Sequence, residues 1–523
     1  MHPTLIRTRF APSPTGPLHM GGVRTALYAY LFAKKNKGAF ILRIEDTDQN
    51  RFVPGAEEYI IESLNWCGIH PDEGVGVGGM HAPYRQSERK ATGIYAKYAA
   101  QLITSGHAYY AFDSTEDLDA KRKEAELKHT SFLYSAETRM ALKNSLSMPE
   151  SEVKAMLDSG TQHVIRLKVP PGEEISFTDL IRGTVTFQSS LVDDKVLLKS
   201  DGMPTYHLAH IVDDIAMEIT HAIRGEEWLP SAPAHIYIYK FLGMENKMPL
   251  YAHLPLLLKP DGNGKLSKRD GDRLGFPVFP LQWKDSVTGE ISSGYREKGY
   301  YPEAFVNILA LLGWNDGTEQ EIFSMNELIE HFSLERIHKA GAKFDPEKAK
   351  WINQQYFRKQ NNEQIAERFL ASINENSSIP SSRLTLGYAT EAVRLLKEKL
   401  HFENELWDAG QYLFIAPVEL DEQILSKKWN TSADSFFTEL INIYKSAENW
   451  NVIALENYFK ESSTQQGINP GSMMQLFRVI VSGKGAGVAL FEMVVLLGKE
   501  EVCQRIRYAL DKIKNTLSIH PST

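Results

Sequence analysis

Cysteine is almost missing from this sequence. The 523 residues contain only two cysteines, Cys67 and Cys503, and these lie far apart in the chain. Two distant thiols exclude a disulfide framework and a CxxC-type metal site. Because proteins without disulfides are typical of reducing compartments, we expect a cytoplasmic protein.

Long apolar runs and a positive net charge are also missing. No apolar run approaches the ~18 residues of a membrane span, and no basic segment followed by an apolar stretch indicates export. The sequence therefore predicts neither a membrane protein nor a secreted one. The net charge of −8 gives no overall attraction to nucleic acid. It does not exclude a nucleic-acid partner, because phosphate contacts depend on local Lys and Arg patches.

The composition that is present is typical of a globular protein with several domains. Hydrophobic residues make up 42% of the chain and charged residues 24%, and 523 residues exceed the usual size of one core. The N-terminal part alternates between strand and helix patterns, with strands expected at 5–10 and 40–44 and a helix at 23–35. Apolar residues of this helix recur at helical spacing: Val23, Ala26, Leu27, Tyr30 and Leu31. Such alternation predicts a parallel β-sheet covered by helices.

The pattern changes twice further along the chain. Between 111 and 190, charged helical segments and short strands indicate an α+β insertion. Strand and helix alternation then resumes, and beyond about residue 320 nearly every segment has helical periodicity. We therefore expect an α/β fold whose parallel sheet is split by an α+β insertion and followed by an all-helical half.

The segment APSPTGPLHMGG, residues 11–22, lies between the first expected strand and the first helix. Ligands bind at this edge of parallel sheets, where glycines let a phosphate approach the backbone and free N–H groups at the helix start attract anions. His19 could donate a hydrogen bond to a phosphoryl oxygen there. The alternative is a Pro-rich turn in which His19 only caps the helix or is exposed.

The pentapeptide KLSKR, residues 265–269, places three cations and a serine on a loop after an apolar run. Such a loop can neutralise charge on a transferring phosphoryl group. Taken alone, it is better explained as a solvated basic loop.

Together the two loops resemble the HIGH and KMSKS signatures of class I aminoacyl-tRNA synthetases. Six segments match the glutamyl-tRNA synthetase family in order along the chain: RFAPSPTGPLHMGG, RIEDTD, PYRQSER, DGMPTYHLAHIVDD, IRGEEWLPSAP and KLSKR. The helical half, with FDPEKAKWIN at 344–353, resembles the bacterial-type anticodon-binding domain. The resemblance covers essentially the whole chain.

The resemblance implies a Rossmann-type class I catalytic core in two halves. A connective α+β insertion would bind the acceptor end of tRNA, and a stem-contact region would carry KLSKR. Two helical anticodon-binding subdomains would follow. The expected parts are, in chain order, the first half of the core at 1–110, the insertion at 111–190, the second half at 191–260, the stem-contact region at 261–335, and the helical subdomains at 336–405 and 406–523.

The activity implied by the resemblance is that of a glutamate–tRNA ligase. With ATP and Mg²⁺ it would convert L-glutamate to glutamyl-adenylate, and it would then transfer glutamate to the 3′-terminal adenosine of tRNA(Glu). The family implies the 2′-hydroxyl as acceptor and a need for bound tRNA in the activation step. We expect a monomer. An enzyme that also charges tRNA(Gln) stays open as an alternative. A nucleotidylyltransferase with an HxGH-type loop fits less well, because such chains usually lack a large helical half and a segment like RIEDTD. The intact His19 and Lys268 argue against a non-catalytic tRNA-binding relative.

The resemblance also assigns site residues, with His19 and Lys268 as the catalytic pair. No residue need act as nucleophile, because the glutamate carboxylate itself attacks the α-phosphorus. The expected ATP-binding residues are Pro12, Ser13, Thr15, Gly16, His19, Gly21, Gly22, Lys265, Ser267, Lys268 and Arg269. The expected glutamate-binding residues are Arg9, Ser13, Glu45, Tyr206, Arg224 and Trp228. A guanidinium can pair with a carboxylate in a bidentate way, which explains why two arginines suit an acidic substrate.

The sequence departs from the family in the insertion. Some relatives bind zinc there through a Cys-x-Cys pair, and this chain has Ala111 and Asp113 at the matching positions. His107, His129 and His163 lack thiolate partners, so we expect no zinc and no other resident metal.

Three further positions have no assigned role. Segment 276–295 is longer than the usual link, and its aromatic residues and prolines suggest an ordered appendage. His210 replaces a small polar residue of some relatives near the ligand. Lys397 or Lys399 lies near the position where strict family members use an arginine to read the last anticodon base, which keeps tRNA(Gln) open as a substrate.

Overall fold

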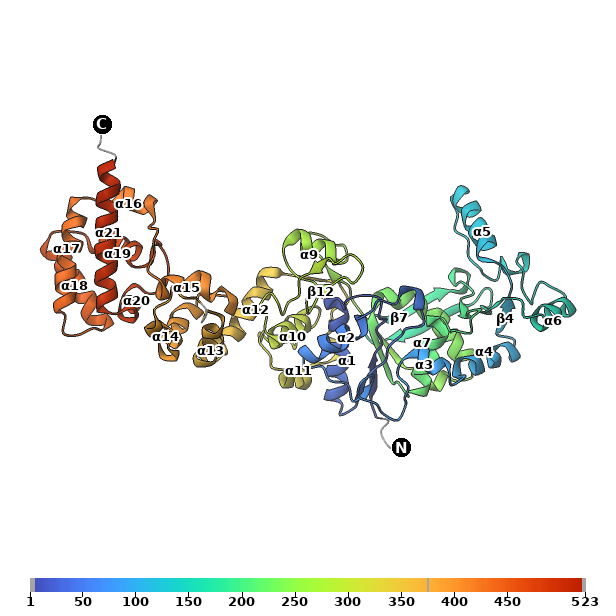
Figure 1. The fold of residues 1–523 in the computed structure, drawn as a ribbon. Coiled ribbons are helices and arrows are strands. Elements are labelled where there is room, and N and C mark those ends of the chain that lie inside the picture. Colours follow the sequence, from blue (N-terminus) through green and yellow to red (C-terminus); the bar gives the residue numbers. More distant parts are fainter. Residues whose placement is uncertain (1–4, 374–375, 520–523) are drawn as a thin grey trace. The chain divides into compact units, whose positions relative to one another are not determined.

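The computed structural model describes residues 5–373 and 376–519, so the outermost expected boundaries at 1 and 523 lie outside the described residues. The chain divides into two compact units, Met1–Ile352 and Asn353–Thr523. Figure 1 shows the helices and strands of each unit.

A seven-stranded sheet forms the centre of the first unit, with strand order β3-β2-β1-β9-β10-β6-β7. All neighbouring strands are parallel except β6 and β7, which are antiparallel. β1 and β2 are buried along their whole length, as expected for strands covered on both faces. The strands are β1 (Arg7–Phe10), β2 (Ala39–Leu42), β3 (Glu73–Gly74), β6 (Glu174–Asp179), β7 (Gly183–Gln188), β9 (His221–Gly225) and β10 (Leu250–Leu254).

Helices cover the faces of this sheet. The predicted helix at 23–35 is present and begins slightly earlier, because His19 caps α1 (Met20–Lys35). α1 packs against β1 and against α10 (Pro302–Leu311). The other helices near the sheet are α2 (Ala56–Trp66), α3 (Gln86–Lys90), α7 (Tyr206–Ala216) and α8 (Ala232–Phe241). The α/β core predicted from periodicity is therefore present.

The structure differs from the sequence prediction at β6 and β7, which lie within 111–190 and yet belong to the main sheet. Tyr251 of β10 pairs with Asp179 of β6, and Phe177 packs with Tyr251 and Ala222 in one apolar cluster. The β6 residues alternate between exposed and buried, a pattern that a hairpin shows in any sheet. Which sheet it joins depends on distant pairing, and local periodicity does not contain that information.

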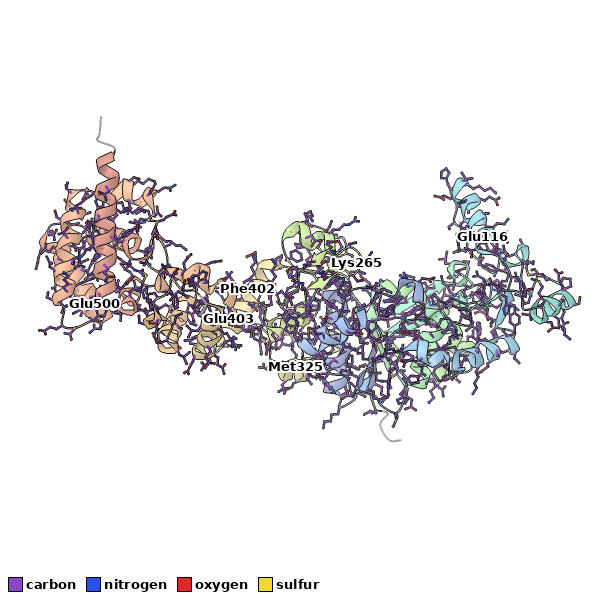
Figure 2. All side chains as sticks on the ribbon, in the orientation of Figure 1. Glu116, Lys265, Met325, Phe402, Glu403 and Glu500 are labelled. Carbon is purple, nitrogen blue, oxygen red and sulfur yellow. The ribbon has the colours of Figure 1, made fainter. Side chains whose placement is uncertain are left out.

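The rest of 111–190 packs with a small antiparallel sheet of three strands, whose outer strands lie at or beyond the predicted bounds, and with an apolar cluster around Tyr109 and Tyr134. α5 extends away from it in Figure 1 and buries only Leu118 among its described residues. Glu116 lies in the first turn of α5, where a carboxylate stabilises the helix dipole (Figure 2). These elements are β4 (Ala108–Ala111), β5 (Val164–Leu167), β8 (Val196–Leu198), α4 (Ile94–Thr104), α5 (Thr115–Leu127) and α6 (Glu150–Asp158).

The end of the first unit carries the KLSKR loop and the appendage predicted at 276–295. The appendage is ordered and contains the hairpin of β12 and β13, which pair antiparallel. Strands β11 and β14 pair in parallel beside the loop. The elements are β11 (Leu257–Leu258), α9 (Lys268–Leu274), β12 (Trp283–Lys284), β13 (Ile291–Ser292), α11 (Met325–His331), β14 (Ala342–Lys343) and α12 (Pro346–Lys359), whose last turns belong to the second unit.

The second unit contains only helices as regular structure among its described residues, which confirms the predicted all-helical half. Aromatic rings of Phe436, Phe437, Phe459 and Phe477 form contacts in its core. No helix of the described residues is both long and apolar enough to span a membrane. The helices are α13 (Asn362–Ile373), α14 (Leu386–Lys397), α15 (Leu406–Phe414), α16 (Glu422–Lys428), α17 (Thr431–Ser446), α18 (Val452–Gln465), α19 (Pro470–Ser482), α20 (Leu490–Leu497) and α21 (Lys499–Ile519).

Candidate functional site

His19 stands between β1 and α1 and presents one unused hydrogen-bond donor. Its Nδ1 accepts the N–H of Gly21 at 3.1 Å, so the ring proton of the neutral imidazole resides on Nε2. Nε2 is buried and has no partner among the described residues. Burial, assisted by the nearby charge of Lys265, lowers the pKa of His19 to about 4. His19 is therefore a neutral donor around neutral pH.

The N–H groups at the start of α1 are not free, contrary to the sequence prediction. The Met20 N–H donates to the carbonyl of Val278 at 2.8 Å, the Gly21 N–H to the His19 ring, and the Gly22 N–H to the His19 carbonyl at 2.8 Å. The appendage and the histidine cap satisfy these groups. An anion at this place would therefore bind to the His19 ring and the helix dipole rather than to unused backbone donors.

Two glycines of segment 11–22 are favoured by space and by backbone conformation. A Cβ on Gly22 would lie 2.6 Å from Cδ1 of Leu18, so a side chain there would require Leu18 to move. Gly16 has a φ of +147°, a conformation that favours glycine. The tight course of this segment thus favours glycine at both positions.

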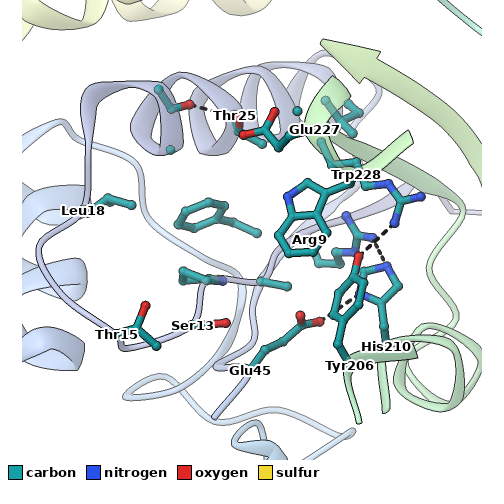
Figure 3. A pocket seen from close by; sticks show the side chains of 18 of the residues that line it. Arg9, Ser13, Thr15, Leu18, Thr25, Glu45, Tyr206, His210, Glu227 and Trp228 are labelled. Atoms are coloured by element: carbon teal, nitrogen blue, oxygen red, sulfur yellow. Dashed lines mark hydrogen bonds and ion pairs between the residues drawn. The ribbon is translucent and has the colours of Figure 1, made fainter. Parts of the chain in front are cut away.

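All six predicted glutamate-binding residues line one cavity of about 370 Å³ at the carboxyl edge of the sheet. Figure 3 shows Arg9, Glu45, Tyr206 and Trp228 around it. Other ligand-site predictions also lie in its wall, namely Pro12, Thr15, Gly21 and Gly22. The cavity has the position that open α/β sheets use for ligands.

Arg9 is held by a carboxylate and by the residue whose role was open, His210. The Arg9 guanidinium donates to Asp214 through Nε and Nη2, each at 3.2 Å, and Nη2 also donates to Nε2 of His210 at 2.8 Å. Nδ1 of His210 then donates to Oε1 of Glu45 at 2.9 Å. Arg43 donates to the same oxygen at 2.9 Å. His210 therefore connects two of the predicted ligand residues.

The titration of this group follows from burial and from these contacts. Burial lowers the pKa of His210 although two carboxylates oppose this effect. Burial would raise the pKa of Glu45, but His210 and Arg43 hold it below its ordinary value. Asp214 is likewise kept ionised by Arg9, His210 and Arg43, which lower its pKa. The charge of Arg9 is thus compensated inside the protein.

Arg224 is different, because its contacts are neutral. Its Nε donates to Nε2 of His253 at 3.0 Å, its Nη1 donates to the Tyr206 hydroxyl at 3.1 Å, and its guanidinium lies 4.9 Å from the ring centre of Tyr251. Arg224 is 5% exposed, and within the described residues no carboxylate lies within ion-pair distance of it. Nη2 of Arg224 is buried and has no hydrogen-bond partner among the described residues.

Aromatic residues complete the cavity wall. Tyr206 begins α7 and its ring lies 4.6 Å from that of Trp228, between ring centres. Trp228 lies on the short 3₁₀ segment Glu226–Ser231 and is 42% exposed. Ser13 is exposed on the loop opposite. Of these residues, Tyr206 contacts Arg224 directly.

A second cavity of about 450 Å³ adjoins the first on the other side of the HMGG loop. It is lined by the predicted ATP residues Pro12, Ser13, Thr15, Gly16, His19, Gly22 and Lys268, together with Phe279, Trp283, Asp285 and Ser292 of the appendage. The Phe279 ring meets the His19 ring edge to face at 6.1 Å between centres. Sequence analysis missed these appendage residues; the aromatic and proline content of FPVFPLQW was the available signal.

The residues of KLSKR differ in their contacts and in whether they line the second cavity. Lys268 lines the second cavity, and its Nζ lies 2.9 Å from Oε1 of Glu290 in the appendage. Lys265 donates to Glu227 at 3.0 Å, and the Ser267 hydroxyl donates to Asp270 at 2.5 Å. Arg269 is exposed. Of the five, only Lys268 lies in the described wall of that cavity.

The positions considered for zinc are occupied by other interactions. His107 stacks on Phe241 at 3.9 Å between ring centres, Nδ1 of His163 lies 2.9 Å from a backbone carbonyl, and His129 lies in a turn. Asp113, like Ala111 before it, lies in the small sheet region and accepts two hydrogen bonds. Within the described residues, no three His, Cys, Asp or Glu side chains are grouped so as to hold a metal ion.

The two lysines considered for anticodon reading differ in exposure: Lys397 is buried and Lys399 is exposed. Lys397 is 5% exposed, and its Nζ donates to the carbonyl of Gln360 and to Asn362 at 2.9 Å. Burial lowers its pKa. Nζ of Lys399 donates to the carbonyl of Gly487. The contacts of Lys397 therefore connect helices of the second unit.

Cys67 and Cys503 are free and buried.

Comparison with known proteins agrees with this geometry. Residues 5–351 match the family of class I tRNA synthetases (E and Q), catalytic domain, and residues 357–510 match an anticodon binding domain. The chain is 52% identical to a glutamate–tRNA ligase of Parabacteroides distasonis, covering 97% of this chain and 99% of that protein, and 53% identical to one of Cytophaga hutchinsonii, covering 97% of both. The crystal structure of a glutamate–tRNA ligase from Elizabethkingia meningosepticum in complex with its amino acid is similar, with 47% identity, a TM-score of 0.92, and coverage of 97% of this chain and 99% of that one. The chain therefore belongs to the glutamate–tRNA ligase family of class I aminoacyl-tRNA synthetases.

Proposed function

We propose that this enzyme activates L-glutamate with ATP and transfers it to the 3′-terminal adenosine of tRNA(Glu). Glutamate would occupy the first cavity, ATP the second, and the HMGG loop would lie between the reacting groups. This proposal unites the family membership with the two adjoining cavities and their charges.

The observation that carries the choice of glutamate is the uncompensated guanidinium of Arg224. A buried charge is costly unless it is paired, and an ionised ligand carboxylate would supply the missing partner. Glutamine carries a neutral amide in place of the carboxylate, so the charge of the Arg224 guanidinium would stay unpaired. A site with a buried polar group can reject a near-isostere by about 10⁴-fold without editing when the group is left unpaired.

The contacts of the ligand α-ammonium are proposed for Glu45 and Ser13. Among the described residues, Arg43 and His210 both donate to Oε1 of Glu45. Oε2 of this carboxylate is therefore left for a ligand. The lowered pKa of Glu45 keeps this carboxylate ionised. Arg9 lies beside it with its charge already compensated by Asp214, so we assign to Arg9 an orienting contact with a ligand oxygen.

The chemical step needs positioning and charge stabilisation rather than a protein nucleophile. The glutamate α-carboxylate attacks the α-phosphorus and pyrophosphate leaves. The buried Nε2–H of His19 would donate to an α-phosphoryl oxygen as negative charge develops there. Lys268 would exchange its contact with Glu290 for the departing phosphates.

Mg²⁺ is implied by ATP chemistry. Such an ion would be carried mainly by the nucleotide phosphates, as is usual for Mg²⁺ at ATP sites. It would add charge neutralisation on those phosphates. Every other role above falls to residues of this chain.

We assign the tRNA contacts by domain. The small sheet region of the insertion would bind the acceptor end, and the helical second unit, which matches an anticodon binding domain, would read the anticodon. The free, buried cysteines support a reducing, cytoplasmic location. In this proposal the enzyme acts as a monomer, which light scattering would test.

The decisive experiment is glutamylation of purified tRNA(Glu) and tRNA(Gln) with ATP and labelled glutamate. We expect charging of tRNA(Glu), and no glutamate-dependent charging of either tRNA would refute the proposal. Charging of both would identify a non-discriminating enzyme. Of the two lysines near the anticodon-reading position, Lys397 is buried and engaged, whereas Lys399 is exposed, so the assay with both tRNAs decides the specificity.

A further inference from the structure

The orientation of Arg224 is set by a chain of three side chains on neighbouring strands. Arg224 of β9 and His253 of β10 are direct partners in the strand register, and Asp179 ends β6 on the other side of β10. Nε of Arg224 lies 3.0 Å from Nε2 of His253, and Nδ1 of His253 lies 2.6 Å from Oδ2 of Asp179. His253 is fully buried and Asp179 is 1% exposed.

Hydrogen-bond chemistry determines where the ring proton lies. A guanidinium can only donate, so Nε2 of His253 accepts and Nδ1 carries the proton that is donated to Asp179. His253 is therefore neutral, in agreement with burial, which lowers its pKa. Asp179 also accepts the N–H groups of Ile181 and Arg182 at 3.0 and 2.9 Å. Burial raises the pKa of Asp179, but the hydrogen bonds from His253 and the backbone hold it below its ordinary value.

The two cavity arginines are thus fixed in different ways. Asp214 contacts Arg9 directly and compensates its charge, whereas Asp179 reaches Arg224 only through a neutral ring. Attraction between charges weakens with distance, so the second arrangement orients the guanidinium and leaves more of its charge for a ligand. A carboxylate in direct contact with Arg224 would also occupy donors that a substrate carboxylate needs.

We propose that His253 and Asp179 are positioning residues that determine the preference for an acidic side chain, because they orient Arg224 without neutralising it. Neither residue belongs to the wall of the glutamate cavity. The inference rests on the proposed function, since it assumes that Arg224 binds the side-chain carboxylate of glutamate.

The main test replaces His253 by leucine, which fills the space and removes both hydrogen bonds. Arg224 then loses its Nε partner and its fixed orientation. We expect the KM for glutamate to rise about 10- to 100-fold in steady-state charging of tRNA(Glu), which is the range for a charged donor left unpaired. We expect kcat and the KM for ATP to change less than about threefold, because the second cavity is not touched. The preference for glutamate over glutamine should fall with the loss of affinity.

Two further variants separate positioning from structure. In His253→Gln the side-chain carbonyl can accept from Arg224 while the amide donates to Asp179, so glutamate affinity should be largely restored. In Asp179→Asn the shape is kept but one donor faces another, and the KM for glutamate should rise about tenfold. The matched control is His221→Gln on β9, a buried histidine that packs against Phe32 outside this chain of contacts; its KM values should equal those of the wild type.

The outcomes distinguish the inference from the function on which it rests. If the wild type does not use glutamate, the proposed function fails. If the wild type does and His253→Leu leaves the KM for glutamate within about twofold, the positioning role alone is wrong. Equal damage in His253→Leu and His253→Gln, with a matching rise in the KM for ATP, would show a structural role only. If His253→Leu does not fold, judged by its melting temperature, the Gln and Asn variants decide the question.

Discussion

The two cavities on either side of the HMGG loop are built in opposite ways. In the first cavity the buried side chains of Arg9, His210 and Glu45 are held by one another and by Asp214, while the exposed Ser13 and Trp228 complete the wall. The second cavity is bounded by loops and by the appendage hairpin, and its main cation is tied to a well-exposed carboxylate, Glu290, whose side chain is 62% exposed.

This difference matches two different tasks. Selecting glutamate requires donors that are fixed in advance, because a rigid site leaves them unpaired with the wrong ligand. Binding a triphosphate requires cations that can move with the departing pyrophosphate. An exposed lysine can change its partner at little cost, since surface ion pairs contribute only about 0–1 kcal/mol. In the proposed function, buried arginines select the amino acid and a partly exposed lysine takes part in the reaction.

The largest effect is expected from Arg224→Ala, which removes the uncompensated cation. We expect kcat/KM for glutamate to fall about a thousandfold or more while the KM for ATP stays within about threefold. Steady-state charging with each substrate varied in turn measures both values. Arg224→Lys is the matched control, and it should recover only part of the loss because a point charge lacks the planar fork. Equal losses toward glutamate and ATP would contradict the separation of the two cavities.

The next effect is expected from His19→Asn, which separates the two nitrogens of this histidine. Asn can still cap α1 by accepting the Gly21 N–H, but it has no donor at the position of Nε2. We expect kcat to fall about 10²-fold with both KM values nearly unchanged, as for loss of a donor to developing charge. Rapid-quench measurement of adenylate formation checks this. His19→Gln, which restores a donor near that position, should recover activity; a kcat of wild-type size in His19→Asn would show that His19 only caps the helix.

Sequence motifs picked out residues that line the two cavities, but not all of the residues that hold them in place. Arg9, Arg224 and Glu45 lie in segments whose order along the chain is specific, and the structure brings them to one cavity. The residues that support Arg224, namely His253 and Asp179, come from β10 and β6 and were not predicted. The contact between them depends on which strands become neighbours, and strand order is a non-local property that periodicity does not contain.

The appendage also shows that sequence patterns do not reveal contacts between distant segments. Its order could be predicted from its aromatic residues and prolines, but its partners could not. The carbonyl of Val278 satisfies the N–H of Met20, so the helix start that was expected to offer free donors has none at that residue. A segment more than two hundred positions away in the sequence thereby changes how the HMGG loop can bind an anion.

A moderate effect is expected from pH on stability. His19 has a folded pKa of about 4 and His207 of about 3, both lowered by burial from the ordinary 6.5. The unfolded chain therefore binds more protons below about pH 6.5, so stability is fully present above that pH and is lost as the pH falls toward these folded values. We expect the free energy of unfolding to drop by about 1 kcal/mol per such histidine between about pH 7 and 5.5.

Urea denaturation at the two pH values measures this drop, and His19→Asn should reduce it by the share of one histidine. Other titrating groups act equally in both proteins, so the difference between them isolates His19. An equal pH dependence in the two proteins would show that the pKa of His19 is not lowered in the folded protein, which would contradict the buried environment assigned to its ring.

The smallest effect is expected from Glu290→Gln, which releases Lys268 from its contact in the second cavity. Because both side chains are partly exposed, the pair contributes little, and we expect the KM for ATP to fall no more than about threefold, with a smaller change at high salt. The control is Glu335→Gln, which alters an exposed carboxylate in the same unit and outside both cavities and should leave both KM values unchanged.

A rise of tenfold or more in the KM for ATP of Glu290→Gln would mean that Glu290 orients Lys268 for the nucleotide rather than releasing it. The second cavity would then be as fixed as the first, and the contrast between a rigid amino-acid site and an adaptable nucleotide site would fail.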